Sequence, residues 1–473
     1  MEHKTLSWWA SLSYIINSLV GAGFLAVPYV FFHGGWALTL VASLFITILN
    51  YIAYTCHIET MARMEAYLQL IETGQHKTSL TDVERYFWKD IGEPLLDREE
   101  ESNKEIKPEV TDRKLEVSDL CYLTLGKTGE FLYLFGFSLG KYGGLTSAAI
   151  LWGTGLSSLI SVPFISDTCD IYDGEFSCRM LYTFWVTIFA IIVLPMTIMD
   201  FREQKWIQIA STGFRLSLVL FMFVSAGLIG LFGSGSNDGD DYPSTQAPEA
   251  SDMAHFGSLF PILLFATAFQ PNIPIIINHL ENRQKNATSL YYSAITGNTI
   301  FLLIFGFVIA YVFGADISRQ ANLNWSPYLT SHGILLKVVA GLILLSPCFN
   351  GTTTYSLRSI VLAESLASLW GYTVEQRKTK KIQVAFRLVV GIPPILASLL
   401  VYNLSDLLAW TGLLFFTTFF ILPGVFYLAA KRMIPQKTPY DTWVSANGWT
   451  YLLLASSSTG LVYCLNQKLF NSQ

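Results

Sequence analysis

The sequence has little charge for its length. Of its 473 residues, 14% are charged and 52% are hydrophobic, whereas about a quarter of the residues in an ordinary soluble domain are charged. A soluble protein of this size would need polar residues to cover the surfaces of several domains. A net charge of −5 also does not favour binding to nucleic acid. We therefore exclude a soluble enzyme and a nucleic-acid-binding protein.

Residues that carry out chemistry are scarce as well. No cluster of His, Cys and carboxylates has the spacing of a metal site, and no Gly-Lys loop for phosphate is present. The sequence thus supports neither an enzyme nor a cofactor nor an ATP-driven pump. The six cysteines are too few for a disulfide framework. Cys169 and Cys178 share one acidic connector and are the candidates for a disulfide, although two cysteines in one loop can also stay free.

Long apolar runs, in contrast, are abundant. Trp8–Phe32 and Trp36–Tyr54 are two of several runs near or above the ~20 residues that cross a bilayer. The runs are continuous rather than alternating, which favours helices over barrel strands. The sequence predicts an all-α polytopic protein of the lipid bilayer with about eleven transmembrane helices, at 8–32, 35–62, 130–160, 181–200, 207–232, 256–280, 288–313, 332–362, 384–402, 406–429 and 448–466.

The distribution of basic residues predicts the orientation. Lys and Arg gather in loops that are cytosolic if the N-terminus is cytosolic, for example at Arg377, Lys378, Lys380 and Lys381. The C-terminus would then be extracellular or lumenal, in the plasma membrane or in a lysosome or vacuole. Asn324 lies in a glycosylation sequon on the same outer side, which is weakened by Pro327.

One polar segment interrupts the helices. Residues 64–117 contain many acidic residues and few aromatic ones, so we expect a mostly disordered cytosolic loop that is either a solvated linker or a binding site for a cytosolic partner. The predicted division is 1–63 for the first two helices, 64–117 for the loop, 118–467 for a surface helix (Val117–Glu130) and the remaining spans, and 468–473 for a tail.

Two of the predicted spans contain helix-breaking residues in mid-membrane. The first span has Gly21 and Gly23 before Pro28, and the sixth has Pro271 and Pro274. Either could be an ordinary kink, since Gly and Pro are common in transmembrane helices. Because the interruptions lie five spans apart, however, they match two five-helix inverted repeats with discontinuous helices around a midplane site.

The two interruptions offer complementary charges. A half-helix that starts near Gly23 would direct free N–H groups at a carboxylate. Carbonyl groups freed near Phe265, Ala266 and Thr267 would suit an ammonium group. Together they predict a site for a small zwitterion such as an α-amino acid.

Several segments resemble the amino acid/auxin permease family. They are Asn17–Pro28, His33–Trp36, Leu120–Gly129, Leu194–Trp206 and Gln270–Pro274, and Glu109–Arg113 with the pattern after Gly140 resembles one poorly characterised branch of it. The resemblance implies a leucine-transporter-like fold, with a five-plus-five inverted repeat and an eleventh helix.

The resemblance also implies roles for individual residues. By motif position, the substrate-binding residues would be Gly21, Ala22, Gly23, Phe24, Phe265, Ala266, Thr267 and Phe269. Asn17 matches an asparagine of sodium-coupled relatives, while Phe349 stands where these have a hydroxyl, so that Thr353 or Thr354 would have to replace it. Core packing for the phenylalanines and a helix–helix hydrogen bond for Asn17 are the structural alternatives.

Two cations lie inside predicted spans. Lys141 and Arg215 are each about a third of the way along a span, and an intramembrane cation usually faces the interior of the bundle. We expect one of them to occupy the position of a coupling sodium ion, which would leave transport coupled to protons or uncoupled. The alternative is a side chain that reaches back to the cytosolic interface.

Two functions follow from these features. The first is a secondary active transporter of amino acids or similar zwitterions, coupled to H⁺ or Na⁺ or uncoupled. The second is a membrane receptor that senses an amino acid without transporting it.

Overall fold

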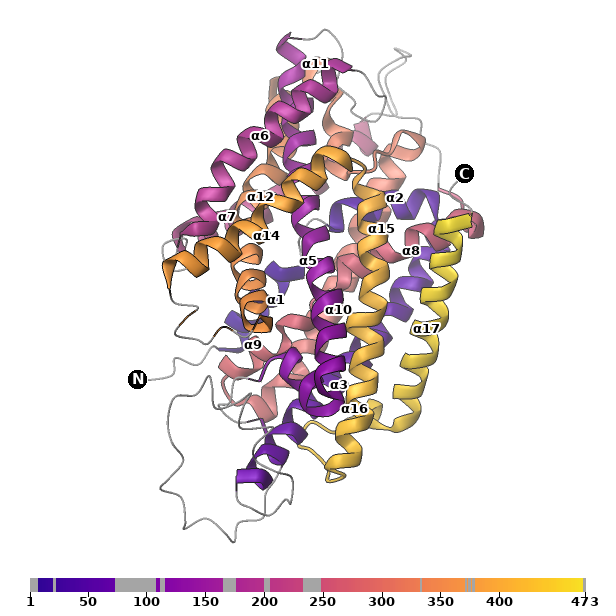
Figure 1. Cartoon of the computed structure of the whole chain (residues 1–473). Coiled ribbons are helices and arrows are strands. Elements are labelled where there is room, and N and C mark those ends of the chain that lie inside the picture. Colours follow the sequence, from indigo (N-terminus) through magenta and orange to yellow (C-terminus); the bar gives the residue numbers. More distant parts are fainter. Residues whose placement is uncertain are drawn as a thin grey trace.

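The structure of the chain is a computed structural model that describes residues 7–19, 23–72, 108–110, 115–164, 176–199, 205–232, 248–331, 334–370, 372, 376 and 379–470. Helices dominate these residues, and no β-strand is among their elements (Figure 1). The elements that the text uses are α1 (Trp8–Leu19), η1 (Gly23–Ala26), α2 (Val27–His33), α3 (Trp36–Glu72), α5 (Val117–Phe164), α6 (Phe176–Ile198), α7 (Lys205–Phe232), α8 (Met253–Thr267), η4 (Gln270–Asn272), α9 (Ile273–His279), α10 (Arg283–Phe313), η6 (Ala321–Trp325), α11 (Tyr328–Ser331), α12 (Ile334–Leu369), α14 (Lys380–Leu400), α15 (Leu404–Phe415), η7 (Phe416–Ile421), α16 (Leu422–Met433), η8 (Trp443–Ser445) and α17 (Asn447–Phe470).

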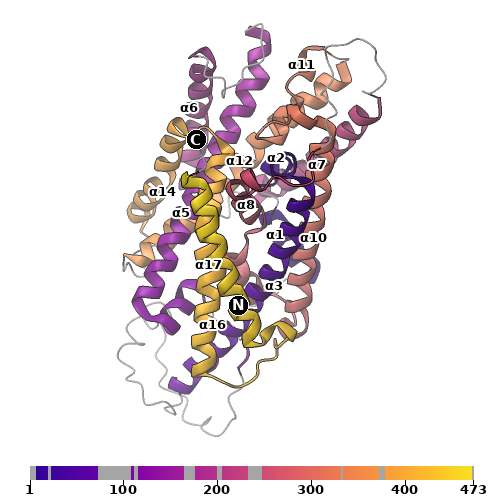
Figure 2. The same ribbon diagram turned by 90° about the vertical axis from the view of Figure 1, so that its right-hand side faces the viewer.

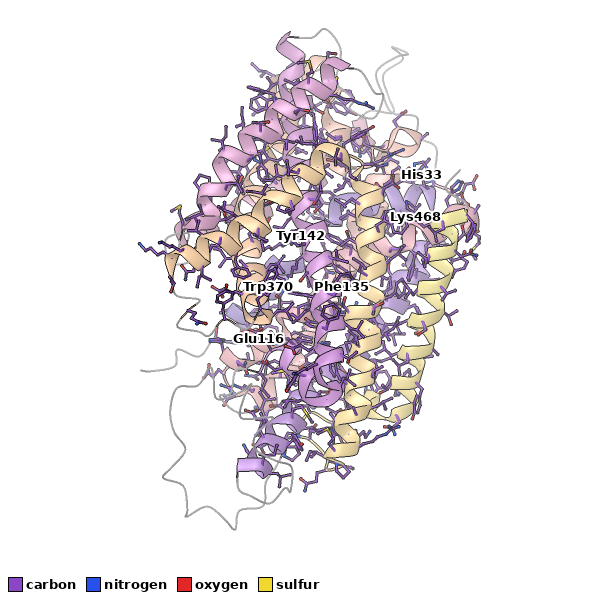
Figure 3. The ribbon with its side chains drawn as sticks, in the orientation of Figure 1. His33, Glu116, Phe135, Tyr142, Trp370 and Lys468 are labelled. Atoms are coloured by element: carbon purple, nitrogen blue, oxygen red, sulfur yellow. The ribbon has the colours of Figure 1, made fainter. Side chains whose placement is uncertain are left out.

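The helices have the length and the surface of membrane spans. Six of those described are long and apolar enough to cross a bilayer, and three shorter apolar helices accompany them. Large apolar side chains point outward along them, such as Phe135 with 57% and Trp370 with 68% of its area exposed (Figure 3). Such a surface suits lipid rather than water. The chain is thus a multi-pass membrane protein, while the count of eleven spans and the sides of the termini stay predictions.

Helix α5 extends along most of the length of the bundle and packs along α12 and α15 (Figures 1 and 2). Glycines on one face of α5 allow α15 to come close. A Cβ atom on Gly143 would lie 2.2 Å from Oγ1 of Thr411, and one on Gly140 would lie 2.5 Å from Cε1 of Phe415. This approach brings Phe415 to the centre of the protein.

The first part of α5 is set off from the rest by Gly126. This residue has φ 71° and ψ −166°, a conformation that glycine adopts without steric cost. The kink falls within Val117–Glu130, which the sequence predicts as a separate surface helix. Within α5, Gly126 thus separates a short first helix from the long helix of the third span.

Helix α3 extends nine residues past the boundary predicted at residue 63. Charged residues just before this boundary are buried and paired. Arg63 lies 2.8 Å from Glu59 and also donates to the carbonyl oxygens of Ile434 and Gln436, at 2.7 and 2.6 Å. Hydropathy alone therefore places the end of this helix too early. Residues 73–107 and 111–114 lie outside the described residues, so the disordered loop remains a prediction.

Two predictions concern the predicted outer connectors. Cys169 lies outside the described residues, whereas Cys178 is buried at the start of α6, so their pairing remains a prediction. Asn324 is buried in η6, and its Oδ1 accepts a hydrogen bond of 2.7 Å from the Ser318 N–H. A buried amide gives a glycan no access in this conformation.

Candidate functional site

The first predicted discontinuous helix consists of separate pieces. Helix α1 is described as far as Leu19, and the chain is next described at Gly23, where it forms the 3₁₀ turn η1. The α-helix resumes as α2 at Val27, with Pro28 in its first turn, a position where the missing N–H of proline does no harm. All four residues of η1 are buried.

The second discontinuous helix is interrupted where Pro271 and Pro274 predict it. Helix α8 ends at Thr267, because Ala268 is extended with φ −79° and ψ 114°. The 3₁₀ turn η4 follows, and α9 begins at Ile273. The carbonyl of Thr267 has no helical donor, since Pro271 lacks an N–H.

A buried amide stabilises this second interruption. Oε1 of Gln270 accepts a hydrogen bond of 2.9 Å from the Phe269 N–H, and Nε2 of Gln270 donates to Oδ1 of Asn50 on α3. Both side chains are almost fully buried. Gln270 thus supplies the backbone partner that the broken helix lacks and ties the interruption to α3.

The two interruptions touch each other. A Cβ atom on Gly23 would lie 2.9 Å from the Cα of Ala266 and 2.9 Å from Cδ1 of Phe265. Only a residue without a side chain allows this approach, which explains the glycine at position 23.

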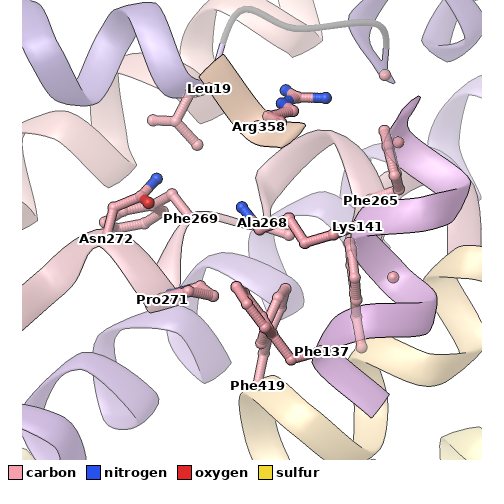
Figure 4. A pocket seen from close by; sticks show the side chains of 14 residues that line it. Leu19, Phe137, Lys141, Phe265, Ala268, Phe269, Pro271, Asn272, Arg358 and Phe419 are labelled. Atoms are coloured by element: carbon pink, nitrogen blue, oxygen red, sulfur yellow. The ribbon is translucent and has the colours of Figure 1, made fainter. Parts of the chain in front are cut away.

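A cavity of about 70 Å³ lies between the interruptions and α5 (Figure 4). It has room for more than one water molecule. Aromatic rings form much of its wall: Phe265 stacks on Phe415 with ring centroids 5.5 Å apart, and Phe415 lies 4.3 Å from Phe419. Phe419 belongs to η7, a π-helical turn, and such turns often occur at functional sites. Phe137 and Phe269 complete the aromatic lining.

Two cations reach into this cavity. Lys141 on α5 and Arg358 on α12 both line it, and Figure 4 shows both side chains at its edge. The Lys141 ammonium lies 5.1 Å from the centroid of the Phe137 ring, within the range of a cation–π contact. Nη1 of Arg358 lies 3.2 Å from where a Cβ on Gly144 would be. No Asp or Glu is among the described residues that line the cavity.

Arg358 also borders a second, smaller cavity of about 30 Å³, which η1 lines as well. Its wall includes Phe24, Thr354 and Gly351. The Thr354 hydroxyl donates to the Gly351 carbonyl at 3.4 Å. Arg358 therefore separates two hollows beside the first interruption.

A larger hollow of about 670 Å³ lies at the predicted outer end of the bundle. Its wall carries charges of both signs, with Asp252 2.6 Å from His255 and Asp406 2.5 Å from Lys468. Figure 3 shows Lys468 near His33, which also lines this hollow.

The structure brings part of the predicted site together. Gly23, Phe265, Phe269 and Lys141 line the central cavity. Phe24 and Thr354 line the smaller one, whereas Ala266 and Thr267 are buried beside the cavities, with the Thr267 hydroxyl bonded to the Leu263 carbonyl at 3.0 Å. Gly21 and Ala22 lie outside the described residues, and so do the side chains of Asn17, Arg215 and Thr353.

Sequence reasoning missed several residues of the site. It used Arg358 only to align the eighth span, although a cation in that apolar run is the same signal that singled out Lys141. Asn50 is a polar residue in an otherwise apolar run and could have been found in that way. Phe415 and Phe419 carry no such signal, because phenylalanine is common in every span.

The comparisons with known proteins agree with this architecture. The family model for transmembrane amino acid transporter proteins matches residues 4–453. Transmembrane protein 104 of Mus musculus is 22% identical over 85% of this chain and 83% of its own length, and the transmembrane protein 104 homolog of Dictyostelium discoideum is 22% identical over 98% and 96%. This is the branch that Glu109–Arg113 and the pattern after Gly140 resemble.

A solved structure shows the same fold. The inward-facing conformation of Mhp1 aligns with a TM-score of 0.53 and 14% sequence identity over 98% of this chain and 89% of that chain. The predicted leucine-transporter-like fold is thereby confirmed, and the family is one of transporters rather than enzymes. With its two interrupted helices and its match to the family model over nearly its whole length, the chain belongs to the family of transmembrane amino acid transporter proteins.

Proposed function

We propose that the protein is a secondary active transporter that carries amino acids, or similar small zwitterions, across its membrane by alternating access. The observation that carries the proposal is the contact of two interrupted helices, Gly23 against Ala266, beside a cavity inside the bundle. Interrupted helices around a central site are how transporters of this fold hold their substrates. Membership in an amino acid transporter family supports the same function.

The interruptions would bind the two charged groups of the substrate. Backbone N–H groups at Gly21, Ala22 and Gly23 would hold its carboxylate. The carbonyl groups that end α8, from Phe265 to Thr267, would accept its ammonium, because the extended Ala268 and Pro271 leave them without helical donors. The phenylalanine rings around the cavity would then exclude water from the bound substrate.

The helix packing supports a rocking motion. Helices α5, α6, α12 and α14 pack against one another in every pairing and would form the scaffold. The bundle that carries the two interruptions (α1 to α2 and α8 to α9) would move against this scaffold. The substrate would then be exposed to one side of the membrane at a time.

Lys141 bears on the coupling ion. Its ammonium lines the central cavity, and a fixed positive charge opposes a sodium ion nearby. We therefore propose that transport is coupled to protons or uncoupled. Asn17, Thr353 and Thr354 would be the residues to hold sodium if it were used.

Flux measurements with the purified protein in liposomes test this function. We expect saturable uptake of at least one amino acid, unchanged when choline replaces sodium. Repeating the assay with and without a pH gradient separates proton coupling from uncoupled exchange. Saturable binding without flux would instead indicate a sensor.

The predicted disulfide would lie on the extracellular or lumenal side of the membrane. We propose that Cys169 pairs with Cys178 in the connector before α6, where an oxidising compartment would favour the bond. Peptide mass spectrometry without reduction would detect the cross-linked pair. Two separately alkylated peptides would refute it.

A further inference from the structure

The central cavity contains more positive charge than a zwitterion needs. Lys141 and Arg358 come from different helices and line the same hollow. They lie close together: Gly144 is one helical turn beyond Lys141, and the Arg358 guanidinium packs where a side chain on Gly144 would be. The absence of a side chain at Gly144 thus lets Arg358 reach the cavity.

Nothing among the described lining residues neutralises these cations. The ion pairs of Arg63 with Glu59, His255 with Asp252 and Lys468 with Asp406 involve none of the residues that line the cavity. The remaining lining is mainly aromatic and glycine, with the amide of Asn272 as a further polar side chain. Two partly buried charges of one sign repel each other, and their desolvation is costly unless an anion joins them.

A neutral amino acid would leave this imbalance in place. Its carboxylate offsets one positive charge, but its ammonium adds another. A dicarboxylic acid without an amino group would offset both cations, and an acidic amino acid, whose net charge is −1, would offset one of them. The aromatic walls around the ligand strengthen the attraction by excluding water. The small volume of the cavity, about 70 Å³, favours a short chain between the two acid groups.

We infer that the physiological substrate is a small dicarboxylate, either an acidic amino acid or a dicarboxylic acid without an amino group, whose second carboxylate binds between Lys141 and Arg358. This inference rests on the proposed transport function and specifies its substrate class. The first carboxylate would occupy the N–H groups near Gly23. An amino group, where present, would face the carbonyl groups at the end of α8.

Binding to the full-length protein tests the substrate class. The probes are L-aspartate, succinate and L-alanine, measured by the shift in melting temperature and by uptake of the labelled compounds into liposomes. We expect L-aspartate or succinate to bind on the order of ten-fold or more tightly than L-alanine, because only these two bring a net negative charge to the two cations. Binding of succinate but not of L-aspartate would identify the substrate as a dicarboxylic acid without an amino group.

Charge variants test the residues. Lys141→Met and Arg358→Met should each weaken dicarboxylate binding by roughly ten-fold or more. The ratio of the dicarboxylate affinity to the L-alanine affinity should fall accordingly. Lys141→Arg should keep the preference for dicarboxylates over L-alanine, because it keeps the positive charge. Lys337→Met is the matched control. Lys337 is exposed on α12, so its loss should not change the affinity for the dicarboxylates or for L-alanine. The melting temperature without ligand shows whether each variant folds.

The outcomes separate the inference from the transport proposal. Uptake of L-alanine but not of the dicarboxylates, unchanged in Lys141→Met and Arg358→Met, would overturn the inference and leave a transporter. Dicarboxylate binding that depends on both cations, without any flux, would support the inference and refute transport. Binding of none of the three probes would overturn the inference.

Discussion

Gly23 and Ala266 meet backbone to backbone, with only 2.9 Å between the Ala266 Cα and the position of a Cβ on Gly23. They belong to the two helices whose interruptions the sequence predicts, yet 243 positions separate them in the chain (266 − 23). Through this contact the two interrupted helices pack directly against each other. In the proposed alternating-access mechanism they would move together against α5 and α12.

A methyl group at position 23 should therefore disturb the site directly. Gly23→Ala should cost about 1–3 kcal/mol in packing, because the new Cβ would press on backbone atoms, which have little freedom to yield. We expect uptake in liposomes to fall by roughly ten-fold or more. Gly227→Ala on α7 is the control, since a Cβ there meets nothing within 4 Å. Equal activity of the two variants would contradict the contact.

Gln270 should be needed for the shape of the second interruption. Gln270→Ala leaves the buried N–H of Phe269 without its acceptor, which costs about 1–3 kcal/mol. We expect a lower melting temperature together with weaker substrate binding. Asn50→Ala should have a smaller effect, because Gln270 still bonds to Phe269. Gln284→Ala serves as an exposed control on α10. If its melting temperature fell as far as that of Gln270→Ala, Gln270 would have no specific role.

The predictable part of the site consists of residues with a local signal. Pro271 and Pro274 break a helix wherever they occur in its interior, and Gly23 weakens one. Such effects act within one turn of the chain, so the interruptions could be located without knowing the neighbours. Lys141 stood out in the same way, as a charge within an apolar run.

Residues that depend on the partner helix could not be predicted. Whether Arg358 faces lipid, scaffold or cavity is decided by the packing of α12 on α5, which hydropathy does not contain. The extension of α3 to Glu72 was missed for a related reason. A charged residue such as Arg63 resembles the start of a solvated loop, whereas the structure buries it against Glu59.

The Arg63 network should be important for stability. Arg63 and Glu59 are buried, and Arg63 also holds two carbonyl groups after α16. Arg63→Ala leaves the Glu59 carboxylate buried without its cation, and breaking such a pair costs about 3–5 kcal/mol. We expect a large fall in the melting temperature.

The pair of Lys468 and Asp406, in which Asp406 is half exposed, provides the comparison. Asp406 has 51% of its side chain exposed, and pairs in contact with water contribute about 0–1 kcal/mol. Lys468→Ala should thus change the melting temperature little. If both variants melted alike, the buried network would contribute no more than a surface pair.

The stability that Asp252 gives to the start of α8 should be lost only in strong acid. Its carboxylate caps the helix by accepting from the N–H groups of Ala254 and His255, at 2.9 and 3.3 Å. The hydrogen bond from the His255 ring, with these backbone bonds, lowers the pKa of Asp252 below its usual 3.8. A lowered pKa means that the carboxylate stabilises the fold above the unfolded value, and that this stability is lost as the pH falls through the folded value.

The comparison of Asp252→Ala with Asp252→Asn tests this cap. Loss of an N-cap costs about 0.5–2 kcal/mol, whereas Asn caps helices about as well as Asp. We expect Asp252→Ala to melt below the native protein by a constant interval between about pH 7 and pH 5, because Asp252 stays ionised there. The interval should shrink only in stronger acid, as the native carboxyl takes up its proton. Asp252→Asn should melt close to the native protein throughout, and an interval that already closed near neutral pH would show that another group provides the cap.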